Sequence, residues 1–165
     1  MLDVGARKTL VALQVGVATE HFTARPQVAR NVNVAYVGRD TPEKGLPLLA
    51  KVWPTAERVP WTPWLDLPWE LSRCRVVVTF SLDRPGWREQ APNYVTCESI
   101  ATGAAVVTSD AGSIPFWLEH YAGSCPGAYV VQQGRPDHLK RASAQLVNDE
   151  PLRAKMAADG RAWVV

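Results

Sequence analysis

Residues 32–45 read VNVAYVGRDTPEKG, a valine-rich run that passes directly into a turn with two glycines and two basic side chains. The run is short, β-branched and apolar at most positions, which is typical of a strand buried on both faces of a parallel sheet. Gly38 follows this strand and lets a ligand approach the backbone, and a helix predicted from Leu46 comes after the turn. The stretch therefore indicates an α/β fold with a ligand-accepting turn at one edge of the sheet.

Three more valine-rich runs alternate with helical patterns along the chain. We expect these further strands at residues 75–80, 105–108 and 128–131. The predicted helices span residues 46–52, 69–73, 95–102, 114–121, 137–148 and 151–165. This alternation is the signature of a Rossmann-like, three-layer α/β domain with a mainly parallel sheet.

Residues 53–69 interrupt the alternation with four tryptophans and four prolines. Because proline cannot donate to a strand ladder, no central strand is expected to run through this segment. We expect an irregular wrap over a sheet edge, with one short strand near residues 58–61. The alternative is that the tryptophan rings form a platform on which a sugar stacks.

The composition excludes several classes of protein. A length of 165 residues fits one domain, and 47% apolar with 21% charged residues is globular rather than disordered. The formal charge of +2 is too small for an electrostatic grip on nucleic acid. No apolar run approaches the ~18 residues of a membrane span, and the first residues lack a convincing leader-cleavage site, so we expect a cytoplasmic protein.

The cysteines and histidines predict neither a disulfide framework nor a metal site. Cys74, Cys97 and Cys125 are widely spaced and form no CxxC pair, so we expect buried thiols. The histidines show no HxH or HxxxH spacing, and the sequence lacks the common dinucleotide, P-loop and nucleophile-elbow motifs. No metal and no cofactor are therefore expected.

Polar or glycine-containing turns follow three of the predicted strands, all at the carboxyl edge of the sheet. The first turn holds Arg39 and Lys44, a pair suited to a diphosphate. The second leads to Glu89 and then to a helix that carries Glu98. The third, residues 109–115, reads SDAGSIP and feeds another helix. Taken singly, the basic turn is equally explained by a solvated surface, and Glu89 and Glu98 are better explained as a loop charge and a helix-end charge. Their coincidence at a ligand-binding edge nevertheless favours a nucleotide site.

Three stretches of the chain match the motifs of one known family. Residues 37–49 (VGRDTPEKGLPLL) are similar to a GR-x4-KG turn, and residues 87–115 to an E-x7-E segment with its following strand and GG-I-P turn. Residues 15–26 (VGVATEHFTARP) are similar to the signature that enters a second domain. Together they resemble glycosyltransferase family 4 and its relatives with the GT-B fold. The resemblance implies the C-terminal, nucleotide-sugar-binding half of that fold.

The resemblance also implies a role for each matching residue. Arg39 and Lys44 hold the diphosphate of the donor and stabilise it as a leaving group, while Glu89 lies near the transferred sugar. Glu98 accepts hydrogen bonds from the ribose hydroxyls. The implied catalytic residues are Glu89, Arg39 and Lys44, and the implied donor-binding set is Gly38, Arg39, Lys44, Glu89, Glu98, Gly112 and Ser113.

The chain departs from the family pattern in two ways that bear on the site and the sheet. Glu89 and Glu98 have eight residues between them instead of seven, so either the loop bulges by one residue or Gln90 takes the first acidic position. The span of residues 45–74 is short and lacks one strand and helix of the usual sheet. If the strand order follows the 3-2-1-4-5-6 pattern, the loss falls on one edge.

The family's acceptor-binding domain has no counterpart in this sequence. We expect residues 1–30 to be a remnant of the interdomain connection and residues 31–165 to be the donor-binding domain. The implied function is transfer of a glycosyl group from a nucleotide diphosphate sugar to an acceptor hydroxyl, with retention of configuration and with an acceptor-binding domain or partner chain. The isolated chain should then be inactive, and residues 10–17 should pack against that partner.

Two other functions stay open at this point. The first alternative is a non-catalytic nucleotide-binding or interaction module derived from the same fold, which pairs with another chain through the tryptophan-rich segment. The weaker alternative is a nucleotide-sugar epimerase of the same architecture, which would also need groups from the missing half.

Overall fold

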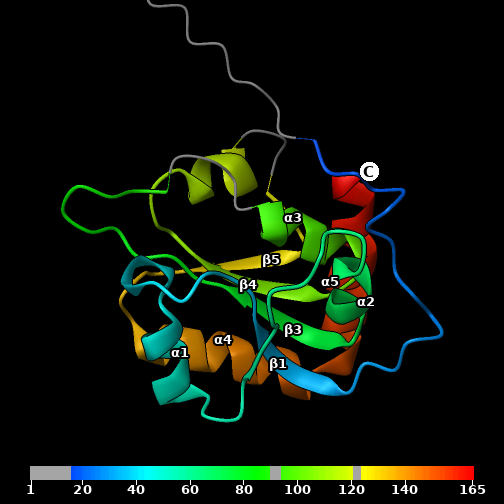
Figure 1. Ribbon diagram of the computed structural model, residues 1–165, viewed down its shortest axis with the longest axis horizontal. Coiled ribbons are helices and arrows are strands. Elements are labelled where there is room, and N and C mark those ends of the chain that lie inside the picture. Colours follow the sequence, from blue (N-terminus) through cyan, green and yellow to red (C-terminus); the bar gives the residue numbers. More distant parts are fainter. Residues whose placement is uncertain (1–15, 90–93, 121–123) are drawn as a thin grey trace, which may run out of the picture.

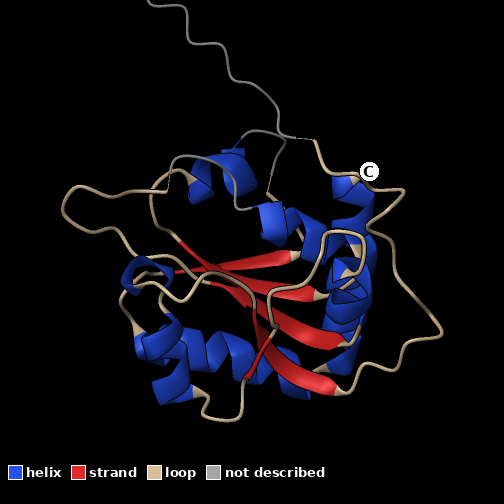
Figure 2. Ribbon diagram, in the orientation of Figure 1, coloured by secondary structure: helices blue, strands red, loops and turns tan. Residues whose placement is uncertain are grey.

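A twisted sheet of parallel strands forms the middle layer of the computed structural model, which describes residues 16–89, 94–120 and 124–165. Figure 2 shows this sheet between two layers of helices. The strand order is β2-β1-β3-β4-β5. The strands are β1 (Val32–Tyr36), β2 (Glu57–Arg58), β3 (Cys74–Thr79), β4 (Ala105–Ser109) and β5 (Ala128–Val131). The predicted α/β class, the parallel sheet and the valine-rich strands are thereby confirmed.

The helices cover both faces of the sheet, as Figure 1 shows: α1 and α4 lie on one face, and α2 and α3 on the other. Helix α5 packs against both α3 and α4. The helices are α1 (Leu46–Val52), α2 (Leu67–Ser72), α3 (Tyr94–Ala101), α4 (Pro136–Asn148) and α5 (Glu150–Val164). The predicted three layers are therefore present.

Two short helical segments differ from the sequence prediction. A 3-10 helix, Pro42–Lys44, comes between β1 and α1, so the basic turn is itself helical. The helix expected over residues 114–121 is a π-helical segment, Phe116–His120, and its last expected residue lies outside the described part of the chain. Ile114 and Pro115 form an α-helical start directly before this segment, where a proline is tolerated because the N–H groups of the first turn have no intrahelical acceptor.

The two faces of the sheet pack into two separate apolar clusters. Val76 faces α4, where Leu139 is buried against it, while its neighbour Val77 faces α3 and packs with Ile100. Successive strand residues thus point to opposite faces, and both faces are dry. This explains why the strand sequences are continuously apolar.

The edge of the sheet beside β1 is covered as expected, but by less strand than predicted. Strand β2 ends at Arg58, although the Val59 N–H still donates to the Tyr36 carbonyl at 3.0 Å. Pro60 has no N–H and stops the ladder, so the strand predicted over 58–61 is wrong beyond its start. Trp61 is 91% exposed and covers nothing.

Residues 17–30 pack onto the sheet domain. Phe22 is buried, and the Arg161 guanidinium of α5 donates to the carbonyls of Phe22, Thr19 and Ala101. The division at residue 30 stays a prediction, and most of the segment 10–17 lies outside the described residues. None of the described helices is long and apolar enough to cross a bilayer.

Candidate functional site

Tyr36 fixes the turn that follows β1. Its buried hydroxyl donates to the Arg39 carbonyl at 2.7 Å and lies 3.1 Å from the Lys44 carbonyl, and burial raises its pKa to about 12. A Cβ on Gly38 would lie 2.8 Å from this hydroxyl, so a larger residue there would displace the hydroxyl from its hydrogen bonds. The turn therefore presents the Lys44 side chain in a fixed place at the carboxyl edge of the sheet.

Lys44 lies in a cluster of polar groups from three segments of the chain. Its ammonium contacts the Glu89 carboxylate and lies 3.4 Å from the Ser81 hydroxyl, which donates to the same carboxylate at 2.9 Å. The ammonium also lies 5.2 Å from the centre of the Trp87 ring, within cation–π range. We call Lys44, Ser81, Trp87 and Glu89 the Lys44 cluster.

The charged pair in this cluster is largely withdrawn from solvent. Only 12% of the Lys44 side chain and 15% of the Glu89 side chain are exposed. Each charge neutralises the other, and both are partly desolvated, so breaking the pair from one side is costly. Any anion that binds Lys44 has to compete with Glu89.

The backbone of the turn after β4 contacts the backbone of Glu89. The Ser113 N–H donates to the Glu89 carbonyl at 2.9 Å. Gly112 has φ +54°, and a Cβ there would lie 2.1 Å from the Glu89 carbonyl oxygen. Gly112 and Ser113 therefore position Glu89 with backbone contacts, and the glycine is required by both conformation and space.

Hydrogen bonds between Ser81 and Ser109 join the chain after β3 to the end of β4, next to this cluster. The Ser81 N–H donates to the Ser109 hydroxyl at 3.0 Å, and that hydroxyl donates back to the Ser81 carbonyl at 2.6 Å. Both serines are buried. The position of Ser81 in the cluster is thus fixed by the sheet and not by the loop that follows.

Arg39 stands apart from the Lys44 cluster. Its side chain is 69% exposed, and its guanidinium lies 3.9 Å from the Glu43 carboxylate. Such an exposed pair is weak. The structure therefore brings Lys44 and Glu89 together but leaves Arg39 at the rim of the turn.

Glu98 occupies a different environment from Glu89. It is half-buried on α3, and burial raises the pKa of its carboxyl, while the charge of His21 acts in the opposite direction. His21 itself stacks on Trp64, with ring centres 4.0 Å apart, and its Nε2 lies 3.0 Å from the Trp64 carbonyl. Glu98 is thus a partly desolvated acid with a histidine nearby.

The loop between β3 and the cluster encloses a shallow depression. Arg84 and Trp87 exchange backbone hydrogen bonds of 3.0 and 2.9 Å, and the Arg84 guanidinium donates to the Pro42 carbonyl at 3.2 Å. The depression lined by residues 83–88 has a volume of about 570 Å³. Trp87 both lines this depression and belongs to the Lys44 cluster.

Sequence reasoning did not assign a role to Ser81, Trp87 or His21. A serine directly after a buried strand was the available signal for Ser81, since strand ends meet at the ligand edge. No spacing pointed to the other two residues, which reach the site through loops. Gln90, the alternative first acidic position, lies outside the described residues.

The comparisons with solved structures place this fold among known proteins. HepE from Anabaena, solved with UDP, has a TM-score of 0.73 and 16% identity over 89% of this chain and 50% of that chain. Sucrose-phosphate synthase from Thermosynechococcus elongatus has a TM-score of 0.73 and 15% identity over 90% of this chain and 46% of that one. The chain therefore spans about half the length of these proteins.

A third structure is matched over nearly its whole length. The C-terminal domain of a group 1 family glycosyl transferase, LpcC from Francisella tularensis, has a TM-score of 0.67 and 17% identity over 90% of this chain and 96% of that chain. No curated protein matches the chain. The family model for group 1 glycosyl transferases matches residues 15–149, and the chain belongs to that family.

Proposed function

We propose that this chain is the donor-binding half of a family 4-like glycosyltransferase. It binds a nucleotide diphosphate sugar, whose glycosyl group passes with retention of configuration to an acceptor hydroxyl held by a second domain or chain. The observation that carries the proposal is the Lys44 cluster, in which a fixed cation stands at the carboxyl edge of the sheet on the family's own turn.

The leaving group explains why a fixed cation is useful there. When the glycosyl bond breaks, negative charge develops on the departing diphosphate, and a preorganised cation lowers the energy of that state. Lys44 is positioned by Ser81 and Trp87, and it meets the diphosphate by exchanging its contact with Glu89. Arg39, at the exposed rim, supplies a forked donor that can leave its weak pair with Glu43.

The two glutamates take different parts of the donor in this proposal. Glu89, which Ser113 and Gly112 support, lies next to Lys44 and therefore next to the bond that breaks. Glu98 lies on α3 with its carboxylate partly desolvated, and two ribose hydroxyls would supply the hydrogen bonds that burial has removed. The solved complex of HepE with UDP supports a nucleotide diphosphate as the ligand class.

The share of each chain covered in the comparisons supports the assignment to one half of the enzyme. This chain corresponds to about half of HepE but to nearly all of an isolated C-terminal domain from the family. We propose that the acceptor lies on the other half. The isolated chain is then expected to bind the donor without transferring its sugar.

A specific observation favours a second candidate, a non-catalytic interaction module. Trp61, Trp64, Leu65 and Trp69 are 91%, 51%, 69% and 43% exposed, respectively, and form a surface suited to a partner chain. Loss of nucleotide binding separates this candidate from the first, since a degenerate module has no reason to keep a diphosphate site.

Calorimetric titration with UDP, GDP and ADP tests the proposal on wild type, Lys44→Ala and Arg39→Ala. A charge-assisted contact is worth about 1.5 to 3 kcal/mol, so Lys44→Ala should weaken binding by about tenfold or more. Lys51→Ala, an exposed lysine at the end of α1, is the matched control and should bind as wild type does. Equal affinity for Lys44→Ala and Lys51→Ala would overturn the site, and no binding of any diphosphate would favour the interaction module.

A further inference from the structure

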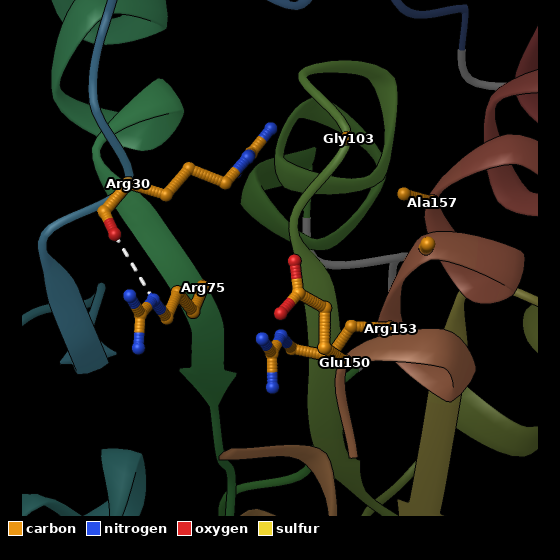
Figure 3. Close-up of a pocket in the computed structure, with 7 residues that line it drawn as sticks. Arg30, Arg75, Gly103, Glu150, Arg153 and Ala157 are labelled. Carbon is orange, nitrogen blue, oxygen red and sulfur yellow. Dashed lines mark hydrogen bonds between the residues drawn. The ribbon is translucent and has the colours of Figure 1, made fainter. Parts of the chain in front are cut away.

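A second concentration of positive charge lies at the opposite edge of the sheet, where the strands begin. Arg30 precedes β1, Arg75 stands near the start of β3, and Arg153 lies in the first turns of α5. These arginines line one pocket of about 280 Å³, together with Gly103, Glu150, Ala154 and Ala157. Figure 3 shows Arg30 and Arg75 on one side of it and Glu150 with Arg153 on the other.

Neutral oxygens hold each guanidinium in place. Arg30 donates to the carbonyls of Cys74 and Thr102. Arg75 donates through Nε to the Arg30 carbonyl at 3.0 Å, as Figure 3 shows, and through Nη1 to the Asn33 side chain at 3.0 Å.

Arg153 is anchored in the same way at the end of α4. Its Nη1 donates to the carbonyls of Leu146 and Val147, each at 2.6 Å. These bonds fix the positions of the arginines without neutralising their charge.

Protein carboxylates balance only part of the positive charge of this pocket. Among the described residues, none of the ion pairs includes Arg30, Arg75 or Arg153. Glu150 is the one carboxylate in the described lining, against three guanidinium groups. Burial lowers the pKa of Arg30, and the charge of Arg153 lowers it further, as expected when like charges share a partly desolvated space.

The pocket also has space and unused donors. In the described part of the chain, Nη2 of Arg75 and both Nε and Nη2 of Arg153 donate to no protein acceptor. The remaining wall consists of Gly103, Ala154 and Ala157. These residues have at most a methyl side chain, which leaves the centre open. Forked guanidinium donors at an open, net positive pocket match the oxygens of a phosphate group.

We propose that this pocket, lined by Arg30, Arg75 and Arg153, is a binding site for a phosphate group, distinct from the nucleotide site proposed above. The ligand is either inorganic phosphate or a phosphate monoester. Because the pocket lies at the amino ends of the strands and the Lys44 cluster at their carboxyl ends, the two sites do not overlap. The arginines keep their role of tying strand ends and helices together, and the phosphate neutralises their shared charge.

Titration of the full chain with inorganic phosphate, at constant ionic strength set with NaCl, tests this site through the melting temperature and the phosphorus NMR linewidth. Ala157→Glu adds a carboxylate to the pocket wall without removing an arginine, and Arg75→Gln removes one positive charge. Each should weaken phosphate binding at least tenfold. Lys140→Gln, an exposed lysine on α4 outside the pocket, and Lys44→Ala, in the proposed nucleotide site, should bind phosphate as wild type does.

The result that overturns the site is a wild-type response to phosphate no larger than that to added NaCl, or equal phosphate affinity in wild type and a folded Ala157→Glu variant. Loss of the response in Lys44→Ala alone would also overturn it, because the phosphate would then occupy the nucleotide site. Glycerol phosphate, titrated in parallel, distinguishes the two sources: tighter binding than inorganic phosphate assigns the pocket to a phosphate monoester, and weaker binding assigns it to the free ion.

Discussion

The ammonium of Lys44 and the carboxylate of Glu89 are in direct contact although 45 positions separate them in the sequence. The contact joins the turn after β1 to the loop after β3 at the carboxyl edge of the sheet. It also means that the cation that we propose binds a diphosphate already has an anionic partner. Donor binding therefore involves an exchange of partners, which makes the affinity for nucleotide sensitive to Glu89.

Glu89→Gln should bind free nucleoside diphosphate more tightly than wild type. Glutamine keeps an oxygen for the Ser81 hydroxyl but carries no charge, so Lys44 is freed and repulsion of the diphosphate disappears. We expect a few-fold gain in affinity, on the order of 1 kcal/mol, measured by calorimetry with UDP. Glu57→Gln removes an exposed carboxylate elsewhere and should leave affinity unchanged. A weaker complex for Glu89→Gln would contradict the competition.

Gly112→Ala should destabilise the protein and weaken nucleotide binding together. The new Cβ would lie 2.1 Å from the Glu89 carbonyl oxygen, and the left-handed φ of +54° adds strain of about 1 to 2 kcal/mol. Since the Glu89 backbone must move, the Lys44 cluster loses its geometry. Urea unfolding and UDP titration measure the two effects.

Gly134→Ala provides the control for this prediction. Gly134 has φ +70° but nothing lies within 4 Å of its added Cβ, so its substitution introduces the backbone strain alone. It should lower stability less than Gly112→Ala and leave UDP affinity unchanged. Equal behaviour of the two variants would show that the contact with Glu89 is unimportant.

The central fold was predictable because its signals are local. The valine-rich strands are buried on both faces, so each reads as a continuous apolar run, and β5 lies at the residues predicted for it. Helix α1 begins after Gly45, whose φ of +67° requires the glycine that the turn motif contains. Because the strands are parallel, the turns that follow them all lie at the carboxyl edge of the sheet.

The composition of the site was only partly predictable, because it depends on the paths of loops. The spacing of apolar residues in the sequence does not indicate those paths. The approach of Trp87 to Lys44 is determined by a backbone bridge between Arg84 and Trp87, and the approach of His21 to Glu98 by stacking on Trp64. In each case a residue from an irregular segment approaches a residue on a helix.

The path of the tryptophan-rich segment was predictable only in part, for the same reason. Its prolines correctly excluded a central strand, but they do not determine on which side each ring lies. Trp61 consequently points to solvent, although a wrap over the sheet edge was expected.

Gly160→Ala should destabilise the protein even though alanine is the better helix former. Gly160 lies in α5 against the loop before β5, and an added Cβ would lie 2.7 Å from the Gly127 Cα and 2.8 Å from the Ile100 Cγ2. Overpacking costs about 1 to 3 kcal/mol, which exceeds the gain of up to about 1 kcal/mol in helix propensity. Urea unfolding measures the balance. Ala158→Gly, at an exposed interior position of the same helix, should lose about 1 kcal/mol through propensity alone, and a stabilised Gly160→Ala would refute the close packing.

Glu98→Gln should stabilise the protein at neutral pH. Burial raises the pKa of this carboxyl, so the folded state binds its proton more tightly than the unfolded state does. The raised pKa therefore stabilises the folded state fully below the ordinary pKa of 4.5. This stabilisation is lost as the pH rises through the higher pKa of the folded state. Glutamine resembles the protonated acid at every pH. The gain over wild type should thus appear in urea unfolding at pH 7 and vanish as the pH falls below 4.5, while exposed Glu20→Gln should show neither effect.

The same Glu98→Gln substitution should weaken nucleotide binding, because a neutral amide oxygen is a weaker hydrogen-bond acceptor than a carboxylate for the ribose hydroxyls that we propose Glu98 holds. If the carboxylate accepts hydrogen bonds from the ribose hydroxyls, the variant should lose affinity for UDP and lose little for its 2′,3′-dideoxy analogue, which cannot donate them. Calorimetry with both ligands at pH 7 measures this difference. Equal losses for the two ligands would mean that Glu98 affects binding only through its charge. Unchanged binding with raised stability would mean that Glu98 has no role in nucleotide binding.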